Sequence, residues 1–484
     1  MDYLIRFVQI HETFRKPETD SLAEMAGLDI EWLSYSEDSP FAIIRFKDTS
    51  DTNAAAKALL ARSILGVAIY ELWGAGVDYD FLHDDIRLRT QPIWDQYSRK
   101  TFRFDMDSFY GSRSASDQRS LIETFSYMAF TGGIRMKKPD NQFRIFEEYV
   151  LDGKIPHHLY FGRLVAESDR KAMNKYSLKK RNYIATTSMD AELSLVTANL
   201  AQAAPGKLAY DPFMGTGSFP VACAHFGAAV FGSDLDGRSI RGKASRNVSS
   251  NFDQYGTAAQ YLGGLVADLT NSPLREERFL NSIVCDPPYG VREGLKVLGS
   301  TRVALKEVVY LADGKPAHLQ ANYVPPKKPY SFMRLLDDIL DFSAERLADD
   351  GRLCMWMPVA GVIEGEDPAA EEDAVPDTEY TIPRHPALEL VSLCKQDFNK
   401  WSRRLLTYRR LRDVTVDVEQ LLAYKAQRLV LAEEIQDCGK MRADDLNAFR
   451  RKVWCSNFVQ NRRSMSKLTY MQYFQGFKEQ APGT

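Results

Sequence analysis

The sequence predicts an α/β protein whose C-terminal half forms a Rossmann-like sheet of seven strands, preceded by an α+β region. Two observations predict this class. From residue 208 onward, short apolar runs typical of buried strands end in acidic residues and alternate with helical patterns. Before residue 180, strand and helix signals also alternate, but nothing resembles a catalytic constellation. We therefore expect a recognition module in front of a ligand-binding sheet.

The length of 484 residues exceeds what one hydrophobic core supports. We predict segments at residues 1–80, 81–180, 181–412 and 413–484, the last a helical extension. The net charge of −3 excludes a chain coated in basic residues, so a nucleic-acid surface must be a local patch. The six cysteines include no Cys-x-x-Cys pair, which is typical of reduced thiols and not of zinc ligands or disulfides.

The first segment alternates strand and helix signals. Residues 4–10, 41–46 and 67–73 are predicted strands, and residues 21–26 and 52–65 are predicted helices. This order is typical of a small split βαβ sandwich.

The second segment gives mixed signals. We predict strands at residues 101–106 and 158–165, and helices at residues 116–130 and 142–151. His157 and His158 are adjacent, so in a strand their rings should point to opposite faces. No metal site is predicted, here or elsewhere in the chain.

Three strand ends in the C-terminal half carry the features of a nucleoside-binding site. The first strand ends at Asp211 and is followed by a loop that contains Phe213, Gly215 and Gly217, where the backbone must pass close to a ligand. Pro220 stands where a dinucleotide fingerprint has its third glycine, so pyrophosphate is disfavoured.

The next two strands end at Asp234 and Asp268. The first of these acids has the spacing to hold both ribose hydroxyls, and the second can accept a hydrogen bond from an adenine amino group.

The fourth strand end reads Asp286-Pro287-Pro288-Tyr289, after an apolar run. Such a motif suits an amino group on a flat ring: the carboxylate accepts one N–H, the rigid turn aims a carbonyl at the other, and the tyrosine stacks on the ring. A strand followed by a proline-stiffened turn explains the isolated motif equally well. The three acidic ends upstream favour the functional interpretation.

The remaining elements complete the sheet. Residues 330–347 are predicted to be a helix, residues 351–358 a strand, and residues 388–394 and 404–408 a closing hairpin. The long polar stretch at 291–329 is interpreted as a lid over the target base, and the acidic stretch at 361–386 as a solvated insertion.

The stretches DPPYGVREG (286–294) and TTSMDAEL (186–193) resemble class I S-adenosylmethionine-dependent amino-methyltransferases, and within them the tRNA guanosine N2-methyltransferases that act at position ten of the D-arm. The likeness extends to the N-terminal half, which resembles a ferredoxin-like domain (1–80) joined to a THUMP RNA-binding domain (81–180).

The resemblance implies roles for individual residues. Asp286, Pro287, Pro288 and Tyr289 are the expected catalytic residues. The expected S-adenosylmethionine contacts are Thr187, Ser188, Met189, Asp211, Phe213, Gly215, Gly217, Asp234, Asp268 and Asp286. Basic side chains beside this machinery suit RNA phosphates, and we expect this role for Arg135, Lys137, Lys138, Lys175, Lys179, Lys180 and Arg292.

The resemblance also implies tRNA as the substrate and a small zinc-ribbon activator subunit as a partner, which would cover apolar surface around Phe226, Val230 and Phe231. With no apolar run of membrane-spanning length, a cytoplasmic protein without membrane contact is expected. Two alternatives stay open: an amino-methyltransferase acting on adenine, cytosine or a protein glutamine, and an RNA-binding scaffold without catalytic activity.

Overall fold

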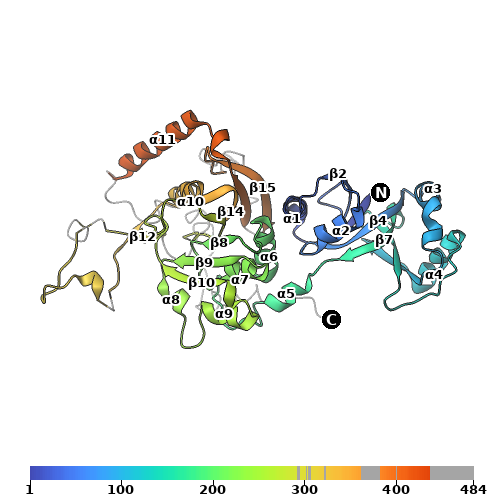
Figure 1. Cartoon of the computed structure of the whole chain (residues 1–484), viewed down its shortest axis with the longest axis horizontal. Coiled ribbons are helices and arrows are strands. Elements are labelled where there is room, and N and C mark those ends of the chain that lie inside the picture. The colour runs from blue at the N-terminus through green and yellow to red at the C-terminus, as the bar shows by residue number, and fades with distance from the viewer. Residues whose placement is uncertain are drawn as a thin grey trace, which may run out of the picture. The chain divides into compact units, whose positions relative to one another are not determined.

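The structure is a computed structural model that describes residues 1–290, 295–300, 302, 307–320, 323–360, 382–398 and 401–436. The chain divides into two compact units, and Figure 1 labels helices and strands described below. The first unit comprises Met1–Lys207, Thr216–Ala229 and Ala244–Tyr261, and the second comprises Leu208–Gly215, Val230–Lys243 and Leu262–Thr484. Each unit is described by itself.

The first unit contains a mixed seven-stranded sheet in the order β2-β3-β1-β4-β7-β6-β5. Because β4 pairs antiparallel with β7, one sheet runs through both N-terminal segments that the sequence suggested. Its strands are β1 Tyr3–Phe7, β2 Ile30–Ser34, β3 Phe41–Phe46, β4 Gly66–Gly76, β5 Phe102–Phe109, β6 Asn141–Tyr149 and β7 Pro156–Glu167. Its helices are α1 Glu12–Met25, α2 Thr52–Leu60, α3 Tyr79–Thr90, α4 Ala115–Glu123 and α5 Lys171–Tyr176.

One secondary-structure prediction for this unit was wrong, and three elements, β2, α3 and α5, were not predicted. The predicted helix at residues 142–151 is strand β6, in which Phe143, Ile145 and Glu147 are fully buried at every second position. The glutamate pair in this stretch favours a helix locally, but pairing with β5 and β7 prevails. The strand β2 was missed because its five residues, with only Ile30, Trp32 and Leu33 apolar, are too few to give a clear alternating pattern.

A buried carboxylate holds several elements of the first unit together. Glu18 of α1 accepts hydrogen bonds from the backbone N–H groups of Ile64 and Leu65, each at 2.9 Å. It also accepts them from the Ser63 hydroxyl at 2.9 Å and from Nδ2 of Asn199 at 2.7 Å. Burial raises the pKa of Glu18 despite these donors. Asn199 lies on helix α6, so this cluster joins α1, the α2–β4 turn and α6.

The first unit also includes three helices from the C-terminal half: α6 Ala191–Leu200, α7 Ser218–His225 and α9 Val248–Tyr255. Asp190 caps α6 by accepting a hydrogen bond from the N–H of Leu193 at 2.9 Å. Asn247 and Ser250 form a capping box at the start of α9. These caps fix where the two helices begin, and α6 begins directly after the segment that carries Thr187, Ser188 and Met189.

The second unit is built on a sheet in the order β10-β9-β8-β11-β14-β16-β15, which confirms the predicted seven strands. Strand β11 is parallel to β8 and β14, while β16 is antiparallel to β14 and β15, so the predicted closing hairpin is present. The strands are β8 Leu208–Asp211, β9 Ala229–Asp234, β10 Tyr261–Val266, β11 Leu280–Cys285, β14 Leu347–Ala360, β15 Leu388–Asp397 and β16 Trp401–Arg410. A small ladder pairs β12 Lys296–Leu298 with β13 Lys327–Pro329.

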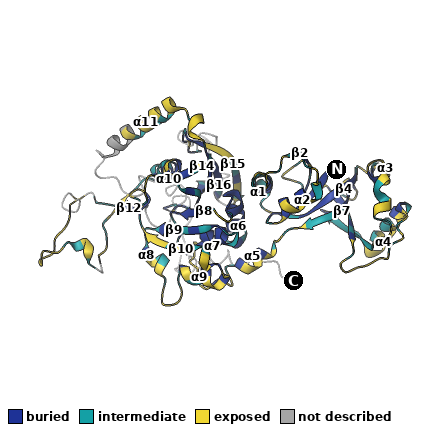
Figure 2. Cartoon of the chain, in the orientation of Figure 1, coloured by how far each residue is buried: buried dark blue, intermediate teal, exposed yellow. Residues whose placement is uncertain are grey.

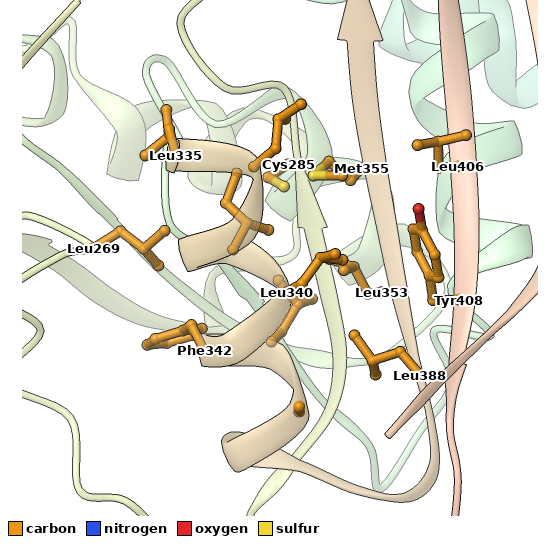
Figure 3. Close-up of a cluster of buried hydrophobic side chains, with 14 of the residues drawn as sticks. Leu269, Cys285, Leu335, Leu340, Phe342, Leu353, Met355, Leu388, Leu406 and Tyr408 are labelled. Atoms are coloured by element: carbon orange, nitrogen blue, oxygen red, sulfur yellow. The ribbon is translucent and has the colours of Figure 1, made fainter. Parts of the chain in front are cut away.

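Helix α10, Phe332–Arg346, packs its apolar side chains against this sheet (Figure 3). The cluster includes Leu340 of α10, Cys285 of β11, Met355 of β14 and Leu406 of β16, all fully buried. Cys285 immediately precedes Asp286, so this core fixes the end of the strand that carries the predicted catalytic motif.

Among its described residues, the second unit contains two further α-helices, α8 Gly237–Arg241 and α11 Val418–Gln436. Residues 418–429 of α11 are largely exposed (Figure 2). It is tied to α10 by an ion pair between Arg428 and Asp338 at 2.6 Å. In the part of the chain that the structure describes, no helix combines the length and apolar character needed to cross a membrane.

Candidate active site

Four predicted acids follow strands that are consecutive neighbours in the second sheet, β10, β9, β8 and β11. Asp211 and Asp234 are the last residues of β8 and β9, Asp286 directly follows β11, and Asp268 lies just beyond β10. The structure therefore places these acids as the sequence predicted.

The carboxylates are close enough to influence one another. Burial raises the pKa of Asp211 well above its usual range; the backbone N–H of Phe213 opposes this rise, and the charges of Asp234 and Asp286 add to it. Burial also raises the pKa values of Asp234 and Asp286. Gathered, desolvated carboxylates are costly on their own and are stabilised by a cationic ligand. This electrostatic setting fits the sulfonium of S-adenosylmethionine.

The glycine loop has the geometry that its sequence predicted. Gly215 and Gly217 have φ angles of +49° and +85°, which residues with a Cβ rarely adopt. A Cβ added to Gly215 would meet no atom within 4 Å, so space lies beside the backbone there. Its N–H donates to Oδ2 of Asp234 at 2.9 Å, and the N–H of Asp236 donates to Oδ1 at 2.8 Å. The hydrogen bond from Gly215 thus holds the loop against Asp234, the predicted ribose-binding acid.

Asp286 has a specific partner within its own motif. The hydroxyl of Tyr289 donates to Oδ1 of Asp286 at 2.5 Å. The ring of Tyr289 is part-buried and meets Phe332 edge-on, with centroids 6.4 Å apart. Pro287 is buried and Pro288 is exposed. The motif thus forms a compact turn in which tyrosine and carboxylate contact each other.

Arg403 of β16 is a charged neighbour of this turn. Its positive charge opposes the rise that burial produces in the pKa of Asp286. The guanidinium lies over the Trp356 ring, 4.5 Å from the centroid, and donates to Gln396 at 2.6 Å. It is therefore held in place by contacts other than the carboxylate.

Both carboxylate oxygens of Asp268 accept hydrogen bonds from within the protein. Oδ1 accepts from the backbone N–H and the hydroxyl of Thr270, each at 3.0 Å, and Oδ2 accepts from the N–H of Leu298 at 2.6 Å. A carboxylate has about four lone-pair sites, so a further donor can still be accepted. Asp268 thereby connects the end of β10 to strand β12.

The segment predicted to cover the donor's methionine end lies in the first unit. The hydroxyls of Ser188 and Thr216 are 2.8 Å apart, which links this segment to the residue between the two loop glycines. Asn251 of α9 donates to the carbonyl of Tyr183 at 2.9 Å and to that of Thr216 at 3.2 Å. Met189 is buried and Thr187 is exposed. Ser188 and Thr216 are therefore brought together within the first unit.

Six of the seven predicted RNA-binding residues lie on the surface of the first unit. Arg135, Lys137 and Lys138 are exposed on a stretch whose backbone bonds to Phe102 at the free edge of β5. Lys175, Lys179 and Lys180 are exposed in and after α5. Arg292 lies outside the described residues.

Two neighbouring arginines have structural contacts instead. Arg170 pairs with Glu192 at 3.2 Å, and the buried Arg181 donates to the Ser218 hydroxyl at 3.1 Å.

Sequence reasoning missed three residues of this region. Arg403 lies 117 positions after Asp286 and only sheet pairing brings it near. Asn251 gives no local signal, since an asparagine in a polar helix is unremarkable in sequence. Gly232 of β9 could have been predicted from the sequence, because a glycine inside a strand often marks a close approach of another backbone segment. A Cβ there would lie 2.5 Å from Sδ of Met214 and 2.8 Å from the carbonyl oxygen of Asp211.

Comparisons with known proteins agree with this organisation. Residues 1–170 match the family model "Tmrp11 THUMP N-terminal domain", and residues 179–299 match "RMKL-like, methyltransferase domain". The chain is 46% identical over 418 residues to the tRNA (guanine(10)-N(2))-methyltransferase of Saccharomyces cerevisiae, covering 84% of this chain and 92% of that protein.

Two further relatives with that description are more distant. The Schizosaccharomyces pombe protein is 35% identical (84% of this chain, 89% of that protein), and the Homo sapiens protein is 33% identical (85% and 88%).

Proposed function

Because the chain belongs to the tRNA (guanine(10)-N(2))-methyltransferase family, we propose that it transfers a methyl group from S-adenosylmethionine to the N2 amino group of guanosine ten in tRNA. The observation that carries the proposal is the Asp286 turn at the end of β11, whose carboxylate lies close enough to Asp211 to raise its pKa. In that arrangement Asp286 can accept a hydrogen bond from an aromatic amine, and the neighbouring carboxylates provide a negative potential that favours a sulfonium.

The donor supplies an electrophilic methyl group on a positively charged sulfur. Asp211, Asp234 and Asp286 favour that positive charge, since all three are desolvated carboxylates. Asp234 would hold the ribose hydroxyls with its remaining lone pairs, and Asp268 would accept a hydrogen bond from the adenine amine. These contacts fix the donor before the base arrives.

The amine needs help because its lone pair is delocalised into the guanine ring. Asp286 accepts one N–H and the backbone carbonyl of Pro287 accepts the other, which favours a tetrahedral nitrogen. The base must leave its stack to reach them, at a cost of a few kcal/mol. Tyr289 stacks on the base once its hydroxyl releases Asp286. The nitrogen–methyl bond would form as the sulfur–methyl bond breaks, with S-adenosylhomocysteine as the leaving group. The N–H proton that Asp286 accepts in a hydrogen bond would pass to that carboxylate. Alignment of the amine with the methyl group would supply most of the rate.

The exposed basic residues of the first unit bind the tRNA backbone. Lys175, Lys179 and Lys180 precede the segment that contains Ser188, and Arg135, Lys137 and Lys138 line the edge beside β5. Phosphate contacts of this kind position the RNA without reading its sequence.

We further propose that the enzyme works in the cytoplasm as the catalytic subunit of a heterodimer with a small zinc-ribbon activator. Strand β10 is an edge strand, and Leu262, Leu265 and Val266 are 63%, 39% and 57% exposed. A partner that adds a strand there would cover these side chains and the unpaired backbone. Val230, by contrast, is fully buried and Phe231 packs on the core, so these residues contribute to the interior.

The test compares substrates directly. Unmodified tRNA transcripts, DNA duplexes and protein extract are incubated with tritiated S-adenosylmethionine, with and without the activator, and labelled nucleosides are identified by mass spectrometry. We expect N2-methylguanosine in tRNA alone. Methyladenine, methylcytosine or labelled protein would indicate a different amine target, and failure to bind the donor in calorimetry would indicate a scaffold.

A further inference from the structure

The start of strand β7 carries two adjacent histidines whose rings lie together. The ring centroids of His157 and His158 are 4.6 Å apart. The expectation that they point to opposite faces was wrong, and the strand pairing explains why. Glu148 of β6 pairs with His158 and Tyr149 pairs with Pro156, so His157 is an extra residue. This is a β-bulge, which re-aims side chains and removes the strict alternation of faces.

The bulge brings a third group to the two imidazoles. Glu148 lies directly across from His158, with an oxygen 3.6 Å from Nδ1 of that ring. One potential ligand atom from each of Glu148, His157 and His158 lies within 4.8 Å of the others. Two imidazoles and one carboxylate form a donor set suited to zinc and its neighbours in the first transition series.

The three groups differ in how firmly they are held. Glu148 is only 6% exposed, and the Tyr160 hydroxyl donates to its Oε2 at 3.4 Å. Both histidines are exposed, so their rings are accessible to an ion from solvent. Ligands about 2 Å from a tetrahedral zinc lie roughly 3.3 Å apart. Contraction from 4.8 Å requires small rotations of the exposed rings, while the carboxylate can remain where it is.

We infer that Glu148, His157 and His158 form a binding site for a divalent transition metal, with Zn²⁺ as the best match. Three protein ligands leave at least one coordination position to water. Because the ligands come from two paired strands, a bound ion cross-links the β6–β7 hairpin and stabilises the folded first unit by an amount that rises with the logarithm of the free ion concentration above its Kd. This site is separate from the residues assigned to methyl transfer.

The test uses the full-length protein without a histidine tag, stripped by chelator. Zn²⁺ binding is measured by calorimetry, and Co²⁺ is used as a spectroscopic probe of tetrahedral coordination. We expect one site that is weakened more than about tenfold in each of H157A, H158A and E148Q. We also expect a melting temperature that rises with Zn²⁺ in the wild type but not in the H157A/H158A double variant.

The matched control is H318A, which removes an exposed histidine that lies elsewhere in the described chain. It should bind Zn²⁺ like the wild type. Both ring substitutions are at exposed positions, so the variants should fold, which circular dichroism checks. Undiminished binding of Zn²⁺ by the double variant, or no binding by the wild type, would overturn the inference.

Discussion

The hydroxyl of Tyr289 donates to Oδ1 of Asp286 at 2.5 Å, so the proposed stacking residue contacts the proposed amine acceptor. The carboxylate has lone pairs left for an incoming amino group, but the Tyr289 hydroxyl must leave Oδ1 before the ring can stack on the base. The same contact keeps a desolvated carboxylate hydrogen-bonded when no base is present. The pair therefore acts as a resting state from which the tyrosine is released when the base enters.

Substitutions of Tyr289 separate its ring from its hydroxyl. Y289F keeps the ring and removes the hydrogen bond that holds it on Asp286, so methyl transfer should be retained, with an unchanged or lower KM for tRNA. Y289A removes the stacking surface, worth about 1–3 kcal/mol per base, and should lower kcat/KM roughly 5- to 150-fold. Steady-state kinetics on a tRNA transcript gives both values. If Y289F lost as much activity as Y289A, the hydroxyl would have a positive role in catalysis.

Asp286 should be essential for transfer and unfavourable for stability. D286N keeps the shape but weakens the acceptor, so the rate should fall at least about a hundredfold. Burial raises the folded-state pKa of Asp286 above its unfolded value. Its contribution to stability is therefore present at low pH and is lost as the pH rises through the folded-state pKa.

D286N should consequently melt at a higher temperature than the wild type, with a difference that grows as the pH rises. Thermal melts across a pH series measure this. D253N, a change at an exposed helical aspartate, is the control and should show no such trend. A lower melting temperature for D286N at neutral pH would contradict the assignment of a desolvated carboxylate.

Arg403 should set the acidic limb of the pH–rate profile. Its charge lowers the pKa of Asp286 against the effect of burial. In R403Q the pKa of Asp286 should rise, so the acidic limb of the kcat/KM profile should move to higher pH. Activity should recover under alkaline conditions, where Asp286 is ionised. R403K, which keeps the charge, should move it less. A uniform loss of activity at every pH would show that Arg403 does not act through the pKa of Asp286.

The lysines after α5 should act on tRNA binding alone. K179E and K180E each remove a phosphate contact, so tRNA affinity should fall and the salt dependence of binding should weaken by about one unit of slope per contact. Filter binding at several salt concentrations measures this, and calorimetry with S-adenosylmethionine should show unchanged donor affinity. K57E, on helix α2, is a surface-charge control that should leave binding unchanged. Equal effects in all three variants would indicate nonspecific electrostatics.

The strand ends were predictable because each combines a short apolar run with an acid, and both signals are local. Asp211, Asp234 and Asp286 follow this pattern, and the glycines at 215 and 217 adopt the positive φ angles that their identity suggested. Strand β6 was not predictable in this way, since its glutamates favour a helix until β5 and β7 pair with it.

The contacts between distant segments were beyond local patterns. Arg403 reaches the Asp286 turn through β14 and β16, and Asn251 reaches the glycine loop from α9. His157 and His158 share a side only because one strand holds an extra residue relative to its partner. Register and bulges depend on the partner strand, which no single segment of sequence encodes.

The most direct measurement uses a tRNA transcript with inosine in place of guanosine ten. Inosine lacks only the exocyclic amine, so the tRNA keeps its fold and its phosphate contacts. We predict binding equal to that of the unsubstituted transcript and no transfer of tritiated methyl groups to the substituted one. Methyl transfer to the inosine-containing tRNA at the wild-type rate would contradict the account.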